Sequence, residues 1–287
     1  GSIRKETRIV EVDPGRHLLK DDMGLTYRYD NLIWAADLKS LYDILDTSGL
    51  SPGVISGIRD ADNRMRKSRG GDSVYTLFLE VDEPVESFGK ITRGQLFYTP
   101  SRQGLGKTHT EDLDSLLADF DEMKKEDILS WLDRFTRLNT YEISIPGLKY
   151  PDLAPPGKTG LIISFLAEYD LFARILKAGW YEEFRSETDD RILDVISGSI
   201  FPMLKDKIIR RFSFSPLDIE KRVGSSEGAI TGWSFGRPLP VEHKIQFSHR
   251  SVLTPIPSVF KAGQWVYSPA GVPMSILTGK LAADKVI

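Results

Sequence analysis

Residues 254–287, TPIPSVFKAGQWVYSPAGVPMSILTGKLAADKVI, carry the pattern that decides the fold. They predict a buried strand ending at Ala262-Gly263, a loop of small residues, and a helix from about Met274 to Lys285 that opens at Gly271-Val272-Pro273. A helix N-terminus presents outward N–H groups and partial positive charge, which suits an anionic or electron-rich ligand edge. Glycines at 263 and 271 allow a flat ring or a phosphate to approach the backbone. An ordinary strand–turn–helix packing unit explains the same residues without a ligand.

The first 36 residues alternate between short strands and turns. Residues 8–12 predict a strand, and a turn at Asp13-Pro14-Gly15 follows it. A second turn, at Asp21-Asp22-Met23-Gly24, precedes a strand predicted over residues 25–29. Residues 31–36 form an apolar run that we expect to be buried. The arrangement is typical of a β-meander.

A change of pattern follows this meander. Asp37 is a candidate N-cap for a helix in which Leu38, Leu41 and Leu45 recur at helical spacing. Residues 46–72 are rich in Ser, Gly, Asp and Arg, so we expect a loop or hinge there with one short helix at most.

The middle of the chain predicts both strands and helices without any repeated unit. Its apolar and aromatic runs predict strands over residues 73–81, 95–98, 141–145, 160–166 and 207–214, and its helical spacings predict helices over 110–137 and 181–204. Because helices and antiparallel-looking strands alternate, we expect an α+β fold.

Composition excludes several classes of function. Among 287 residues, 40% are hydrophobic and the net charge is -3, which gives no general attraction to nucleic acid. There is no cysteine, so disulfides, thiolate catalysis and cysteine-ligated metals are excluded. The histidines lack the spacing of a metal site, so we expect no metal.

Two Gly-Lys-Thr runs, at residues 106–108 and 157–159, invite a phosphate-loop interpretation. That motif needs a glycine five positions before the first Gly, and those positions hold Ser101 and Asp152. Neither run is therefore expected to bind a nucleotide phosphate.

The closing stretch resembles the last flavin-binding motif of the phytoene desaturase, carotenoid isomerase and retinol saturase group within the amine-oxidase superfamily. In that group a strand ends in Gly-Asp or a near variant, and a Pro/Gly loop, Gly-Val-Pro and a helix follow. Gln264 stands where Asp is commoner, and Ala270 where Gly is commoner. The matching residues are Gly263-Gln264, Ser268-Pro269-Ala270, Gly271-Val272-Pro273, Thr278-Gly279 and Ala282-Ala283.

This resemblance implies an FAD cofactor. It places Gly263 and Gln264 by the ribityl-pyrophosphate, and Gly271, Val272 and Pro273 at the pyrimidine end of the isoalloxazine. Residues 9–37 resemble the meander of the same family, which implies that the backbone of Val10 meets the adenine and that Ala35 and Ala36 approach the cofactor.

Two further stretches extend the resemblance over nearly the whole chain, from about residue 8 to the end. Residues 145–160, IPGLKYPDLAPPGKTG, are similar to a segment of the family's substrate domain, and residues 224–235 are similar to its glycine-rich loop. The implied layout is a flavin-domain remnant over 1–66 and 223–287, made of a β-meander plus the C-terminal strand-turn-helix. Residues 70–222 then form a substrate-binding domain with a mixed sheet flanked by helices.

The family's opening strand–Gly-x-Gly-x-x-Gly–helix segment has no counterpart in this sequence. We therefore expect the chain to be part of a longer protein and to bind FAD weakly or not at all by itself. Removal of a covering layer is expected to bare an apolar patch near Ile33 and Val259, through which the chain would self-associate.

The resemblance implies a parent enzyme that desaturates, saturates or isomerises a long apolar polyene by hydride exchange at the flavin. The catalytic residues stay unassigned, because the chemistry belongs to the cofactor. Most aromatic residues in proteins belong to cores. Four are nevertheless candidates to line an apolar tunnel: Tyr98, Trp233, Phe235 and Trp265. Two alternatives remain open: an amine-oxidase-like flavoenzyme for a small polar substrate, and a non-catalytic domain that packs against a partner.

We expect the partners to be an apolar small-molecule substrate and no nucleic acid. A cytoplasmic location is expected, and the resemblance adds peripheral membrane contact, because members of the family often reach lipid substrates.

Overall fold

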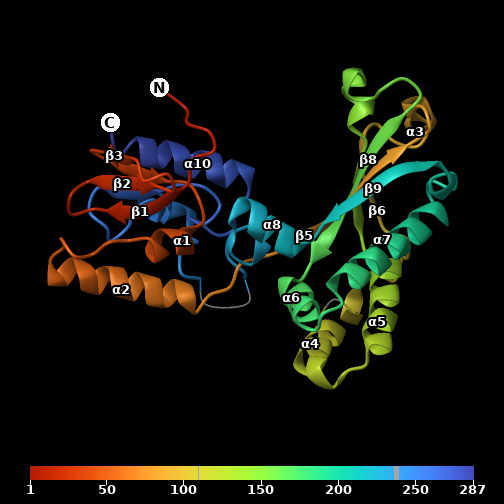
Figure 1. Cartoon of the computed structure of the whole chain (residues 1–287), viewed down its shortest axis with the longest axis horizontal. Helices are drawn as coiled ribbons and strands as arrows, with labels where there is room; N and C mark the ends of the chain where they lie inside the picture. Colours follow the sequence, from red (N-terminus) through yellow and green to blue (C-terminus); the bar gives the residue numbers. More distant parts are fainter. Residues whose placement is uncertain (109, 236–238) are drawn as a thin grey trace. The chain divides into compact units, whose positions relative to one another are not determined.

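The computed structural model describes residues 1–108, 110–235 and 239–287. The chain divides into two compact units, of which unit 1 comprises Gly1–Asp72 and Glu220–Ile287 and unit 2 comprises Ser73–Ile219 (Figure 1). The chain passes from unit 2 back into unit 1 within α8 (Pro216–Val223). Helices and sheets occur in both units, so the fold is α+β. The assignment of the units to a flavin domain and a substrate domain stays a prediction.

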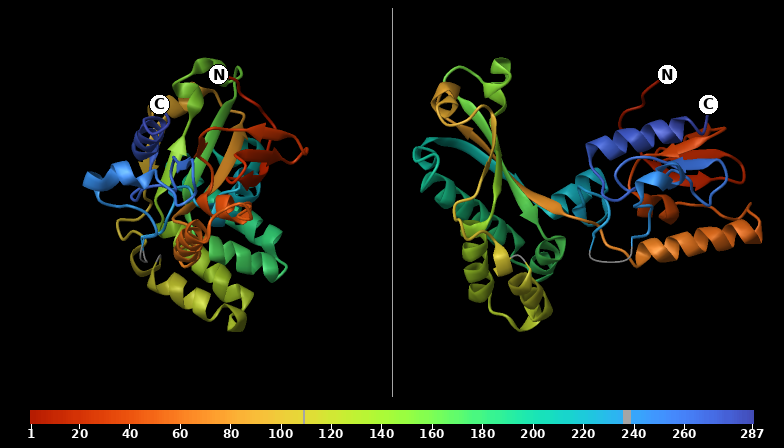
Figure 2. Two further views of the ribbon diagram at one scale, coloured as in Figure 1. Left: turned by 90° about the vertical axis from the view of Figure 1, so that its left-hand side faces the viewer. Right: turned by 180° about the vertical axis from the view of Figure 1, so that it is seen from behind.

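Unit 1 begins with a three-stranded antiparallel sheet of β1 (Ile9–Asp13), β2 (Leu18–Asp21) and β3 (Thr26–Arg28). The buried Asp21 carboxylate holds the second turn, because it accepts hydrogen bonds from the N–H groups of Met23 and Leu25 and from the Tyr27 hydroxyl. The Tyr27 hydrogen bond lowers the pKa of Asp21. Both chain ends lie on the side of unit 1 that carries α10 (Val272–Ala283), as Figure 2 shows.

A second sheet of unit 1 pairs β4 (Leu32–Trp34) with β10 (Val259–Lys261) in parallel. The expectation that residues 31–36 are buried was wrong, because Ile33 is 36% exposed and Ala35 and Ala36 are exposed. The physical reason is strand alternation: Leu32 and Trp34 of β4 pack against the core of unit 1, and Ile33 between them points to the other face. Val259 by contrast is buried, so only the Ile33 half of the expected apolar patch is exposed.

The helices of unit 1 include a long one that the sequence pattern did not predict. Asp37 caps α1 (Leu38–Asp43) as expected, since its carboxylate accepts the Ser40 N–H at 2.9 Å. Residues 46–72, expected to be mainly loop, contain the 15-residue helix α2 (Pro52–Arg66). Apolar residues recur three and four positions apart along this helix: Val54, Ile58, Ala61 and Met65. The last three are buried, and this burial outweighs the polar composition of the segment. A short helix, α9 (Ser248–Ser251), precedes β10.

Unit 2 is built on a five-stranded sheet in the order β6 (Gln95–Tyr98), β7 (Tyr141–Ser144), β8 (Thr159–Ala167), β5 (Ser73–Val81) and β9 (Ile208–Phe214). Every neighbouring pair is antiparallel, so the expectation of a mixed sheet was wrong. The shortest connection between neighbouring strands spans residues 145–158, so strand direction was decided by pairing between distant segments and not by a local sequence pattern.

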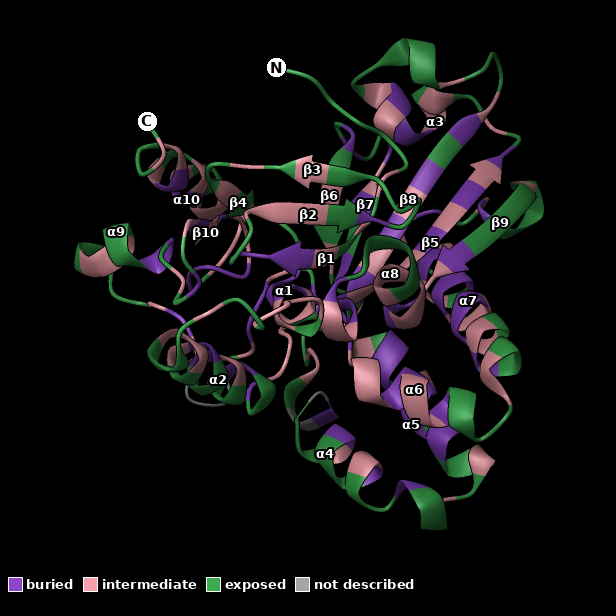
Figure 3. Cartoon of the chain, turned by 60° about the vertical axis from the view of Figure 1, so that its left-hand side comes forward, coloured by how far each residue is buried: buried purple, intermediate pink, exposed green. Residues whose placement is uncertain are grey.

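Helices flank this sheet on one face, and the helices of the described residues leave its other face open (Figure 1). The covering helices are α4 (Glu111–Ala118), α5 (Lys125–Leu138), α6 (Tyr169–Lys177) and α7 (Tyr181–Ser197), and α3 (Val85–Gly89) follows β5. Buried and partly exposed residues alternate strictly along β5, as Figure 3 shows. The strands therefore point one row of side chains into the core and one row out of it.

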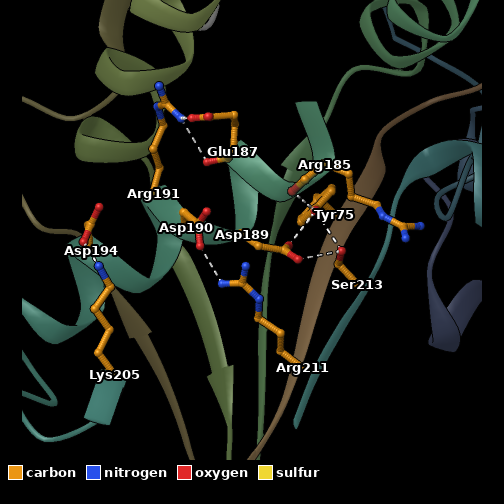
Figure 4. A network of polar contacts seen from close by, with 10 residues as sticks. All are labelled: Tyr75, Arg185, Glu187, Asp189, Asp190, Arg191, Asp194, Lys205, Arg211 and Ser213. Carbon is orange, nitrogen blue, oxygen red and sulfur yellow. Dashed lines mark hydrogen bonds and ion pairs between the residues drawn. The ribbon is translucent and has the colours of Figure 1, made fainter. Parts of the chain in front are cut away.

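A buried polar network fastens α7 to the covered face of the sheet (Figure 4). The Tyr75 hydroxyl lies 2.6 Å from Asp189 Oδ1, and the Ser213 hydroxyl donates to Asp189 Oδ2 at 3.1 Å. Burial raises the pKa of Asp189 and of Tyr75 above their ordinary values. These groups satisfy one another beneath the helices, so we assign them a structural role.

Candidate functional site

The sequence-predicted cofactor residues come together mainly where β4 and β10 end. The parallel register pairs Leu32 with Val259 and Trp34 with Lys261, so Ala35 and Ala262 follow at the same edge. The Ala262 N–H donates to the Trp34 carbonyl at 2.9 Å, which extends the pairing by one step. In open α/β sheets, ligands bind in the crevice beyond the carboxyl ends of parallel strands.

Gly263 turns the chain away from β10 in a conformation that favours glycine. Its φ is +94°, and a Cβ at this position would lie 3.5 Å from the carbonyl oxygen of Ala35. The Gly263 N–H donates to the Thr278 hydroxyl at 3.1 Å, and that hydroxyl donates to the Ser275 carbonyl on the same helix. Thr278, a residue that the sequence analysis gave no separate role, thus connects the strand end to α10.

The N-cap of α10 is Gly271, which has a φ of +122° and offers no side-chain cap. Val272 and Pro273 are the first two helical residues, and both are exposed. The N–H groups of Val272 and Met274 have no acceptor inside the helix, because the first-turn N–H groups of any helix lack one. This turn therefore offers donors and partial positive charge to a ligand edge, and no side chain of Gly271 covers them.

The glycine-rich loop packs tightly against the residues after β10. The Gln264 side-chain amide donates to the Ala229 carbonyl at 3.2 Å, and the Trp233 indole N–H donates to the Trp265 carbonyl at 2.9 Å. Trp233 and Trp265 are buried, so these two aromatics belong to the core and do not line a tunnel. A Cβ on Gly232, which has a φ of +76°, would lie 2.2 Å from the Gln264 carbonyl oxygen.

Val10 belongs to a different sheet from the other candidates: it lies in β1 of the three-stranded antiparallel sheet, and not in the β4–β10 pair. It stands at the irregularity in register between Ile9 and Glu11 and is 40% exposed. The role of Val10 stays a prediction, as does that of each of the other seven cofactor-binding candidates.

Lys261 is a charged residue in an unusual place, directly before Ala262 and Gly263 at the end of β10. Strand alternation places it on the same side as the buried Val259. Burial and, to a smaller extent, the nearby Arg64 charge lower the pKa of Lys261 to about 8.

Unit 2 holds a second surface of interest, which the sequence analysis missed. A groove of about 380 Å³ lies on the open face of the sheet, between the outer rows of β5, β8 and β9 and the segment after Pro146. Lys158 in this groove belongs to the family-like stretch of residues 145–160, but no role was predicted for it. The available signal was the alternation along β5 and β9, which sends Phe78 and Phe212 to the open face.

The sequence profile of flavin-containing amine oxidoreductases matches residues 1–287 of the chain. The chain belongs to this family. Among curated protein sequences, none matches it significantly.

Three solved structures are similar to the chain. An oxidoreductase from Methanosarcina mazei is 11% identical with a TM-score of 0.51, over 97% of this chain and 49% of that one. Reduced UDP-galactopyranose mutase is 10% identical with a TM-score of 0.46, over 74% and 35%. A protein from Pyrococcus furiosus is 11% identical with a TM-score of 0.42, over 98% and 46%. The chain therefore spans less than half the length of these structures.

The family implies a flavin, and the residues at the β4–β10 edge fit one. Glycines with positive φ stand at both Gly263 and Gly271, and the first turn of α10 leaves donors free of side chains. Both features suit a planar ring that approaches the backbone. Within the described parts of the chain, no helix is long and apolar enough to cross a membrane.

Proposed function

We propose that this chain supplies one wall of an FAD site and the substrate-facing sheet of an FAD-dependent oxidoreductase that acts on a long apolar chain. The observation that carries the proposal is the convergence of two parallel strand ends with the start of α10. The match to flavin-containing amine oxidoreductases over the whole chain supports it.

In this proposal the backbone of unit 1 holds the cofactor. Gly263 and Gly271 give the flavin room to approach, and the N–H groups of Val272 and Met274 donate to its electron-rich edge. The Thr278 hydroxyl keeps the Gly263 turn and α10 in register. Bound FAD would supply the hydride exchange that changes the saturation or geometry of the substrate.

The open face of unit 2 favours an apolar substrate over a small polar one. Phe78 stacks on Phe212 with ring centroids 4.8 Å apart, and Phe214 meets Phe78 edge-on at 5.5 Å. Phe212 is 47% exposed, and exposed apolar side chains of this kind are typical of surfaces that bind apolar ligands. The residues of this face orient the substrate and exclude water, and we assign no acid or base to them.

The flavin part of the proposal is tested by titrating the isotope-labelled 287-residue chain with FAD and recording amide NMR spectra. We expect weak binding, since the sequence lacks a Gly-x-Gly-x-x-Gly segment, with shifts of the Gly263, Gly271, Val272 and Met274 amides. Gly271→Val should abolish these shifts, because a β-branched side chain is strained at a φ of +122° and fills the approach to the helix start.

Gly279→Ala is the matched control, since Gly279 lies in the same helix with open space around its Cβ position. This variant should keep the FAD-induced shifts. Shifts confined to unit 2, or unchanged by Gly271→Val, would contradict the proposed site.

The substrate class is tested with all-trans-retinol, an apolar polyene, against benzylamine, a small polar amine. We expect retinol to shift the resonances of Phe78, Ile162 and Phe212 on the open face, and benzylamine to leave them in place. The reverse result would favour the small-amine alternative, which the name of the family suggests.

A further inference from the structure

The groove on the open face of unit 2 has one charged end. Lys158 Nζ lies 3.4 Å from Glu80 Oε1, and an Arg210 guanidinium nitrogen lies 3.3 Å from Glu80 Oε2. Two cations therefore share one carboxylate, and these three are the charged residues among those that line the groove. Their sum is one positive charge at this end.

Both cations keep donors for a further partner. A lysine ammonium has three N–H donors and an arginine guanidinium has five. Each of the two side chains uses one donor in its contact with Glu80, so the other donors can bind a further group. The Lys158 side chain is 41% exposed and that of Arg210 is 72% exposed. A charged group bound here stays in partial contact with water, which avoids the cost of burying it.

The rest of the groove is apolar. Phe78 and Phe212 stack within it, and Ile162 stands opposite Phe78 in the β5–β8 register. Leu153, which is 62% exposed, forms part of the wall that the segment after Pro146 contributes. A volume of about 380 Å³ lies within the range of about 300–1,000 Å³ that is usual for small-molecule sites.

Beyond the groove, the open face carries first a polar pair of residues and then an apolar pair. Thr76 and Ser164, the polar pair in the next rows, are hydrogen-bonded to each other at 3.0 Å, and Val74 and Leu166 form the pair beyond them. Glu80 lies six positions after Val74 in β5, which corresponds to roughly 20 Å at about 3.3 Å per residue of strand. The face is therefore long enough for an extended chain, with its charged end at Glu80.

We propose that the groove binds long-chain carboxylates, with the head group on Lys158 and Arg210 and the apolar chain on Phe78, Phe212 and Ile162. The charge supplies the preference for an anion, and the planar, bidentate geometry of arginine suits a carboxylate in particular. That these carboxylates are the substrates of the enzyme rests on the proposed function, in which the open face of unit 2 contacts the substrate.

The test is an NMR shift titration of the 287-residue chain with octanoate and, separately, with 1-octanol, two probes with the same chain length and different head groups. We expect octanoate to bind about ten-fold more tightly, since hydrogen bonds to charged groups contribute on this scale even after solvent screening. The shifts should fall on residues of the groove.

Three variants separate the head group from the chain. The double variant Lys158→Gln/Arg210→Gln should remove the preference for octanoate and leave 1-octanol binding unchanged. Phe212→Ser should weaken both ligands by a similar factor. Arg211→Gln is the matched control, because Arg211 is adjacent on β9 but pairs with Asp190 of α7, on the helix-covered side of the sheet.

Several outcomes would overturn the inference: no binding of octanoate, equal affinity for the two probes, or a preference that persists in the double variant. The titration contains no flavin, so its failure leaves the FAD-induced shifts of unit 1 unaffected. Conversely, loss of those shifts with a retained octanoate preference would reject the flavin assignment and leave the groove as a carboxylate site.

Discussion

Gly232→Ala is expected to destabilise unit 1 by about 2–5 kcal/mol. Gly232 has a φ of +76°, and placing an L-residue in this region costs about 1–2 kcal/mol. The added Cβ would also lie 2.2 Å from the Gln264 carbonyl oxygen and 3.0 Å from its carbon. Both atoms belong to the backbone and can move only with the strand end, so overpacking adds about 1–3 kcal/mol.

The measurement is chemical denaturation followed by the fluorescence of tryptophans in unit 1, where Trp233 and Trp265 pack together. The Gly279→Ala variant serves as control, and it should be neutral or stabilising by up to about 1 kcal/mol. Because the displaced backbone carries Gly263 and Gln264, Gly232→Ala should also weaken the FAD-induced shifts. An unchanged denaturation midpoint would show that the loop and the strand end separate at little cost.

Lys261→Met is expected to stabilise the chain at pH 7 by about 1–3 kcal/mol. Burial lowers the pKa of Lys261 from 10.5 in the unfolded chain to about 8 in the folded one. Between these values the unfolded chain holds more protons, so wild-type stability rises as the pH increases from about 8 to 10.5. Below pH 8 the folded chain bears the cost of holding this charge in a partly buried place, at about 1.4 kcal/mol per pKa unit.

Denaturation midpoints recorded from pH 7 to pH 10 in both proteins provide the measurement. The difference between variant and wild type should shrink as the pH rises, because only the wild type gains stability by releasing this proton. Lys280→Met, which alters an exposed lysine of α10 paired with Asp284, is the control and should change stability by no more than about 0.5 kcal/mol. A difference that is constant over this pH range would exclude a perturbed Lys261.

Much of the fold was predictable where local patterns and long-range packing agree. Residues 73–81 form a strand with the predicted bounds, because branched and aromatic side chains alternate over the full length of β5. Asp37 caps α1 as its position predicts, and the helix after Gly271 begins at Val272. In each case the residues that make the structure are neighbours in the sequence.

Local composition predicts the wrong structure where tertiary contacts decide it. Residues 46–72 resemble a loop in composition, yet the spacing of Val54, Ile58 and Met65 gives α2 a face that packs into the core of unit 1. The residues of the candidate flavin site were named from a family resemblance. Their convergence depends on the parallel pairing of β4 with β10, which joins segments more than 200 residues apart in the chain.

The sequence by itself determined the α+β class, the cap of α1 and the strand–turn–helix at the C-terminus, because short-range sterics and hydrogen bonding fix these features. Only the tertiary structure decided that the sheet of unit 2 is antiparallel with one open face, and that Glu80, Lys158 and Arg210 meet there. Strand order and register bring these side chains together, and no local pattern in the sequence encodes which strands will pair.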